Sequence, residues 1–323
     1  MYKVIMVPTD GSGFDREAIR VALRTAERCN AKVRLVRVLG TSSFFSIAAA
    51  AEGIPAADVD LSERDRAWSE LYALAAECRS ESKADITADL HGGPVDDVLE
   101  GYARRHRVDL IVISTHGRSG LARLSLGSVT DSLIRHTTIP VLVVKPPASY
   151  LNPRPSEAFK RIIVPLDGSS LAEQILPRVV ALAKLEEAEI TLLNVLIPDS
   201  SSHQAVVDPT LPWWEKDISG ARAYLFHVAA TLRRGGTPVR TDVVIGDNVA
   251  SAICDYAGRE RADLIAIATH GRGGLARMLR GSVATAVMQS AKVSMLVLKP
   301  DMLAELEATR SEISVTDEVM CVR

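Results

Sequence analysis

The chain has 323 residues, of which 38 are basic, 40 are acidic and 47% are hydrophobic. At a prior of ~150 residues per domain, this length predicts two domains with a core each. The balanced charge argues against nucleic acid and against an acidic membrane surface as partners. The apolar run at the start is too short for a secretory leader, and no run approaches the ~18 residues of a membrane span. We therefore expect a cytoplasmic protein without membrane contact.

Strands and helices alternate along residues 1–147, the first predicted domain. Residues 3–8 form a short β-branched strand, and the turn after it leads into a helix that Ser12 could cap. The other strands are expected at residues 32–39, 86–91, from 109 and at 141–145, with helices at about 61–82, 94–106 and from 127. This alternation forces parallel pairing. We therefore predict an α/β, doubly wound, Rossmann-like domain with a five-stranded parallel sheet flanked by helices.

A proline-rich linker at residues 148–159 precedes a second domain at residues 160–300, in which the same order of elements restarts. Its strands are expected from residue 161 and at 189–196, 239–245 and 295–299, besides the strand inside the motif described next. Pro177 falls inside the first helix of this domain, where it should remove a hydrogen bond and bend the helix. A C-terminal tail, residues 301–323, has no counterpart in the first half.

One motif occurs once in each half and carries the clearest functional signal. In the first half an apolar strand ends at Ser114, a turn with Gly117 follows, and nine residues later Gly127 and Ser128 open a helix. The second half repeats this spacing at Ala268, Gly271, Gly281 and Ser282. Unpaired N–H groups and the positive dipole end at a helix N-terminus favour an anion, and glycine lets the backbone approach it. The motif therefore predicts a phosphate site in each half.

With these motifs the chain resembles the universal stress protein family, and it looks like a tandem of two such domains over residues 1–147 and 160–300. The family's nucleotide signature is Gly-x2-Gly-x9-Gly-Ser/Thr, and both halves match it except at its first glycine, where Ser114 and Ala268 stand. The resemblance implies an adenine nucleotide alpha hydrolase-like fold. It also implies an aspartate near the ribose, at Asp10 or Asp167, and a valine backbone at the adenine.

The resemblance implies an adenine nucleotide, ATP or ADP, in one or both halves, with Mg²⁺ as a counter-ion of its phosphates. The aspartates would accept hydrogen bonds from ribose hydroxyls, and the glycines, serines and arginines would surround the phosphates. The predicted binding residues of the first half are Pro8, Thr9, Asp10, Val38, Ser114, Gly117, Arg118, Gly127, Ser128 and Val129. Those of the second half are Pro165, Leu166, Asp167, Val195, Ala268, Gly271, Arg272, Gly281, Ser282 and Val283.

Three classes of function stay open on the sequence. The first is a nucleotide-binding regulatory protein of the stress response. The second is a nucleotide-free structural or partner-binding tandem, toward which Ser114 and Ala268 point. The third is an enzyme that hydrolyses ATP, but the phosphate loops lack an evident general base and a metal-carboxylate set. We therefore predict no catalytic residue and no metal site, and weak incidental ATP hydrolysis is the most that the sequence allows.

The last strands of the two halves, residues 141–144 and 295–298, are apolar throughout. In an isolated doubly wound sheet each would leave an exposed edge that invites aggregation, and pairing removes that edge. We therefore predict that the two halves pair through these strands as an intramolecular pseudo-dimer, as the resemblance also implies. Homodimerisation of the whole chain and an unidentified protein partner stay open.

Overall fold

The structure is a computed structural model that describes residues 2–40, 61–115, 126–145, 158–198, 213–269 and 282–300. The first half contains β1 (Val4–Pro8), α1 (Arg16–Cys29), β2 (Lys32–Leu39), α3 (Leu61–Glu81), β3 (Asp85–Gly92), α4 (Val95–Arg105), β4 (Leu110–Ser114), α5 (Ser128–His136) and β5 (Val141–Val144). The second half contains β6 (Arg161–Pro165), α6 (Ser170–Glu173), α7 (Leu176–Glu186), β7 (Glu189–Leu196), α8 (Trp213–Arg234), β8 (Val239–Ile245), α9 (Val249–Arg259), β9 (Leu264–Ala268), α10 (Ser282–Ser290) and β10 (Ser294–Leu298). The predicted tail, and the predicted linker up to residue 157, lie outside the described residues.

The described strands form one continuous ten-stranded sheet in the order β3-β2-β1-β4-β5-β10-β9-β6-β7-β8. Neighbouring strands within each half are parallel, which confirms the predicted doubly wound α/β fold. At the middle of the sheet β5 and β10 pair antiparallel, with Met295 opposite Val143 and Leu296 opposite Leu142. The predicted pairing of the last strands is therefore confirmed, and neither apolar strand is left as a free edge.

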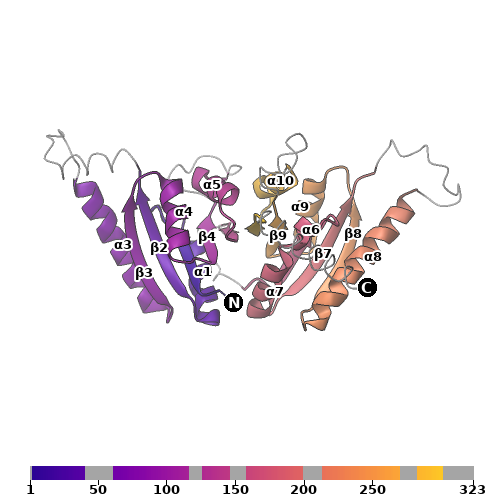
Figure 1. The fold of residues 1–323 in the computed structure, drawn as a ribbon, viewed down its shortest axis with the longest axis horizontal. Helices are drawn as coiled ribbons and strands as arrows, with labels where there is room; N and C mark the ends of the chain where they lie inside the picture. Colours follow the sequence, from indigo (N-terminus) through magenta and orange to yellow (C-terminus); the bar gives the residue numbers. More distant parts are fainter. Residues whose placement is uncertain are drawn as a thin grey trace, which may run out of the picture.

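Helices cover both faces of this sheet, and each face carries one core that runs through both halves. One core joins side chains of α1, α3, α7 and α8 to the sheet, and the other joins side chains of α4, α5, α9 and α10. Figure 1 shows α3 and α8 at the two outer ends of the molecule and α5 and α10 near its middle. The halves therefore share their hydrophobic cores as well as their sheet.

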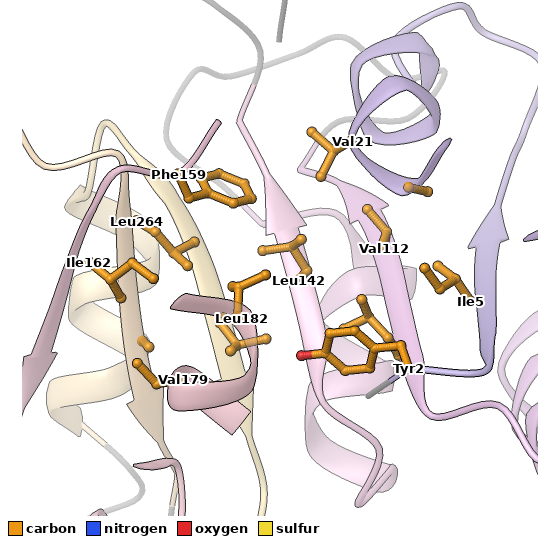
Figure 2. Close-up of a cluster of buried hydrophobic side chains, with 14 of the residues drawn as sticks. Tyr2, Ile5, Val21, Val112, Leu142, Phe159, Ile162, Val179, Leu182 and Leu264 are labelled. Atoms are coloured by element: carbon orange, nitrogen blue, oxygen red, sulfur yellow. The ribbon is translucent and has the colours of Figure 1, made fainter. Parts of the chain in front are cut away.

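The join between the halves is apolar and closely packed. Leu142 of β5 is fully buried. Figure 2 shows it between Val112 of β4 on one side and Leu182 of α7 with Phe159, just before β6, on the other. Because side chains of both halves bury one another here, this contact is part of the core and not a surface added to two finished domains.

Two local expectations from the sequence prove wrong. Ser12 does not cap α1, because the chain makes a further turn through Gly11 and Gly13, both at positive φ, and the helix begins only at Arg16. The Ser12 hydroxyl instead accepts a bond from the Phe14 N–H at 3.4 Å. Pro177 does not bend a helix, because the helix is already divided into α6 and α7. It lies in the first turn of α7, where a missing N–H leaves no helical bond unmade.

A charged contact between α1 and α7 also crosses the join. The carboxylate of Glu186 is fully buried, 3.4 Å from Arg24 Nη2 and 3.8 Å from Arg28 Nη1. Arg28 also donates to the Leu185 carbonyl at 2.8 Å, and the Arg24 guanidinium lies 5.4 Å from the centre of the Phe159 ring. Both arginines keep contact with solvent, whereas Glu186 has none. The carboxylate thus depends on arginines from the other half for its charge compensation.

We expect the double change Arg24→Ala with Arg28→Ala to lower the free energy of unfolding by more than Glu186→Gln does. The double change leaves a buried carboxylate without a cation, at a cost of about 3–5 kcal/mol, whereas Glu186→Gln leaves cations that can reach water. Denaturant unfolding measures the difference. Arg20→Ala is the control, since its pair with Glu17 is on the same helix but more exposed. Equal losses of unfolding free energy in the double arginine variant and in Glu186→Gln would contradict the dependence of the carboxylate on these arginines.

Candidate functional site

The predicted site residues that the structure describes lie, in each half, at one end of the sheet, where parallel strands finish. In the order of the strands, β1 is flanked by β2 and β4, and β6 is flanked by β7 and β9. From β1 the chain goes to β2 and β3 on one side and then crosses to β4 on the other, and β6 to β9 follow the same order, which makes the gaps β1/β4 and β6/β9 topological switch points. Ligands of open α/β sheets bind outside the carboxyl ends of the strands at such points.

A pocket opens at this point in the second half. It brings together residues from the ends of β6, β7 and β9 and from the first turn of α10. The predicted binding residues among its lining are Pro165, Leu166, Asp167, Val195, Ala268 and Val283. Apart from Asp167, the described residues of its wall carry hydrocarbon side chains, so this part of the pocket suits a flat apolar group with a polar group at its mouth.

Seven further residues line the pocket and were missed from the sequence: Leu171, Ala172, Leu193, Val249, Ile253, Ile267 and Ala284. Two of them had a readable signal, because Val249 and Ile253 are four residues apart and share one face of α9. The sequence did not show that this face closes a pocket, since that depends on where α9 packs against the sheet. Leu171 and Ala172 belong to the short α6, whose separation from α7 was also unforeseen.

Asp167 is exposed at the mouth of the pocket and is held there by its own turn. Its Oδ1 atom accepts hydrogen bonds from the Ser169 backbone N–H at 3.0 Å and from the Ser169 hydroxyl at 2.6 Å. The same hydroxyl accepts a bond from the Ala172 N–H at 3.1 Å and so caps α6. These bonds fix one carboxylate oxygen and leave the other, Oδ2, without a hydrogen bond among the described residues.

The corresponding place in the first half is more polar. Asp10 is half-buried and accepts a bond from the Ser12 N–H at 2.9 Å, as Asp167 does from Ser169. Beside it the buried Thr9 donates its hydroxyl to the carboxylate of Asp15, which is only 4% exposed. Burial raises the pKa of the Asp15 carboxyl, and the Thr9 hydrogen bond opposes that rise. The first half therefore buries a carboxyl group next to the predicted ribose site.

The matching positions of the second half are Leu166 and Ala172, which are apolar and line the pocket. The supports beneath the two turns differ as well. In the first half the turn lies on the Arg37 guanidinium, whose Nη1 atom donates to Glu70 Oε2 at 2.9 Å. The turn is so close that a Cβ atom added to Gly11 would lie 2.9 Å from the same Nη1 atom. In the second half Asn194 occupies this position and donates to the Leu166 carbonyl at 2.8 Å. The two predicted sites are therefore not equivalent.

The predicted phosphate end is described in the first half from Leu126 onward. Gly127 precedes α5 with φ −60°, and its N–H donates to the Thr115 carbonyl at 3.1 Å. The Thr130 hydroxyl donates to the Ser114 carbonyl at 3.1 Å, which ties the helix to the end of β4. Ser128 is exposed and Val129 half-buried in the first turn, where the backbone N–H groups have no helical acceptor. A phosphate would therefore meet N–H groups after Gly127 and not that of Gly127 itself.

The other predicted residues are placed as follows. Pro8 is buried at the end of β1, and Val38 is half-buried near the end of β2, opposite His91 of β3. Ser114 and Ala268 end β4 and β9, opposite Val144 and Leu298. Ser282 begins α10, but its side chain is not described. Gly117, Arg118, Gly271, Arg272 and Gly281 lie outside the described residues.

Two features are absent from the described ranges. No helix in them is both long and apolar enough to cross a membrane. Within the same ranges, no group of three or more His, Cys, Asp and Glu side chains is arranged to hold a metal ion. The described part of the pocket offers a ligand its apolar wall, Asp167 and the start of α10.

Comparison with known proteins agrees with this architecture. The model of the universal stress protein family matches the chain twice, over residues 1–145 and 158–299. The chain belongs to the universal stress protein family. Both matches coincide with the halves of the sheet, so the protein is a tandem of two universal stress protein domains.

Individual relatives cover one domain or both. A universal stress protein of Methanocaldococcus jannaschii is 33% identical over 147 residues, which are 46% of this chain and 84% of that protein. One from Mycolicibacterium smegmatis is 26% identical over 317 residues, covering 92% of this chain and 97% of that protein. Among solved structures, a universal stress protein from Archaeoglobus fulgidus has a TM-score of 0.64 at 18% identity, over 92% of this chain and 98% of that one. That last likeness shows a shared fold.

Proposed function

We propose that this tandem universal stress protein binds ATP or ADP in the pocket of its second half and acts as a nucleotide-binding regulator of the stress response in the cytoplasm. The observation that carries the proposal is the pocket itself. It lies at the β6/β9 switch point, has one carboxylate at its mouth, and is walled by the first turn of the helix that follows the Gly-x9-Gly-Ser motif.

The lining of the pocket fits the parts of an adenine nucleotide. An adenine ring is flat and largely apolar, which suits the hydrocarbon side chains of Val195, Ile253 and Ile267. Asp167 Oδ2 can accept bonds from ribose hydroxyls, because the Ser169 bonds occupy only Oδ1. The N–H groups at the start of α10 would receive the phosphates, with Mg²⁺ as their counter-ion. Gly271, Arg272, Gly281 and Ser282 are the residues of the motif that we assign to this end.

Binding is proposed in preference to turnover. Hydrolysis needs a positioned water and a group to take its proton. Among the described residues that line the pocket, Asp167 is the sole side chain able to accept a proton, and we assign it to the ribose. Slow incidental hydrolysis is the upper limit that we place on this protein as an enzyme.

The first half is proposed as the structural partner of the second. The buried Asp15 carboxyl and the Thr9 hydroxyl replace the apolar wall that Ala172 and Leu166 provide in the second half. A carboxyl group at this place disfavours both an apolar base and a polyphosphate. This observation favours a first half without nucleotide. We therefore propose a stoichiometry of one nucleotide per chain, bound in the second half.

We expect Asp167→Ala to weaken the binding of ATP and of ADP by roughly 10- to 100-fold. Loss of a charge-assisted hydrogen bond to the ribose costs about 1–3 kcal/mol, and the exposed side chain contributes little to folding. Titration calorimetry on the purified chain gives both the affinity and the stoichiometry.

Asp10→Ala is the matched control, since it removes the equivalent carboxylate from the first half. It should leave the affinity of the second-half site unchanged. Wild-type affinity in the Asp167→Ala variant would contradict the assigned role of this residue. No binding by the wild-type chain would refute the proposed function and favour the nucleotide-free tandem.

A further inference from the structure

A lysine of the first half reaches the last helix of the second. Lys145 follows β5 directly, and its Nζ atom donates to the carbonyls of Met288, at 3.1 Å, and of Ala291. These carbonyls lie at the C-terminal end of α10. The Lys145 backbone N–H also donates to the Ser294 hydroxyl at 3.2 Å, which fixes the start of the side chain at the same junction.

A second lysine makes the mirror contact. Lys299 follows β10, and its Nζ atom donates to the carbonyl of Arg135 at 2.8 Å, in the last turn of α5. Each half therefore places a cation at the C-terminal end of the other half's last helix, where free carbonyls and the negative end of the helix dipole favour it.

The two helices do not depend equally on these lysines. α5 carries Arg135 and His136 in its own last turn, as well as Asp131 in its first. α10 has no basic residue in its last turn and no acidic residue in its first. Lys145 thus brings to α10 a cation from the other half that its own last turn lacks, while Lys292 follows two residues after the helix and is exposed.

The N-terminal end of α10, opposite the end that Lys145 contacts, faces the pocket of the proposed ligand. Its first-turn residues Val283 and Ala284 line the pocket, so the position of this helix decides the width of the pocket. The helix has nine residues, and Lys145 holds its opposite end.

We propose that Lys145 is a positioning residue of the second-half nucleotide site, supplied by the first half. It fixes α10 from behind, so that the helix presents its first turn to the phosphates and its side chains to the base. This inference rests on the proposed function of that pocket. It gives the first half a definite part in a site whose described lining residues all belong to the second half.

Stability without ligand is a poor measure of this role. Lys145 is half-buried, and burial lowers the pKa of its ammonium group, which means that keeping the charge inside the fold has a cost of its own. Lys145→Met removes that cost together with the two hydrogen bonds, so the effects on unfolding oppose each other. The affinity for nucleotide is the better measure, because Lys145 carries the cost of its burial in both the free and the bound protein, so that cost does not enter the affinity.

The test compares Lys145→Met, Lys145→Arg and Lys299→Met with the wild-type chain, by titration calorimetry with MgATP and MgADP. Lys145→Met should bind roughly two- to five-fold more weakly, the range expected for a charge at a helix end. Lys145→Arg keeps the cation and should regain most of the affinity. Lys299→Met removes the mirror contact from α5 and should bind as the wild type does. Hydrogen exchange should rise in residues 283–290 of Lys145→Met and not in residues 129–136.

Unchanged affinity in Lys145→Met, with the wild type binding normally, would overturn this role and leave the proposed function intact. Equal weakening by Lys299→Met would overturn it too, because the effect would then come from loosening the join in general. If the wild-type chain binds neither nucleotide, the proposed function fails and the role of Lys145 fails with it.

Discussion

Ala268→Phe is expected to abolish nucleotide binding. Ala268 ends β9 and its side chain lines the pocket, so a phenyl ring there would occupy the space that we assign to the nucleotide. The pocket is open and apolar, so the ring has space to enter it, although Ala268 also packs against the buried core. The variant should therefore fold as the wild type does and lose only the ligand.

Thermal unfolding with added ATP measures this effect. At about one hundred times Kd, ATP should stabilise the wild-type chain by ~2.7 kcal/mol, a rise in Tm of roughly 4 °C for a chain of this length that unfolds in one transition. The Ala268→Phe variant should show no rise. Ser114→Phe places the same ring at the equivalent end of β4 in the first half and should keep the full rise. A retained shift in Ala268→Phe would place the nucleotide elsewhere.

Leu142→Ala is expected to destabilise both halves together, by about 2–5 kcal/mol, the usual cost of truncating a buried leucine. Leu142 is fully buried and pairs with Leu296 across the join, where side chains of both halves pack on it. Denaturant unfolding should show one transition, and hydrogen exchange should rise in β1 and in β6 alike. The reason is that the two halves share a sheet and two cores, so neither can open alone.

Leu71→Ala is the matched control for this prediction. Leu71 is an equally buried leucine on α3, at the outer end of the first half. Its loss should raise exchange mainly in the neighbouring β2 and β3, since those strands can open locally while the join stays closed. Two separate unfolding transitions, or unchanged exchange in the second half of Leu142→Ala, would show that the halves fold independently.

Much of the fold follows from the sequence. Strands at residues 189–196 and 239–245 have the bounds expected from their β-branched runs, and the alternation with helices leaves parallel pairing as the sole simple solution. The apolar run at 141–144 also predicted its partner, because a strand without polar positions needs cover along its edge as well as on its faces. These features depend on local composition and spacing, which a single sequence contains.

The tertiary structure alone decided how the sites are built. Periodicity marks Val249 and Ile253 as apolar, but the packing of α9 over the sheet turns their face into the wall of a pocket. The positive φ values of Gly11 and Gly13 moved the start of α1, since glycine permits such a turn without requiring it. The inequality of the halves and the contact of Lys145 with α10 could not be foreseen either. Residues that are distant in the chain meet there, and their energies depend on the distances that folding sets.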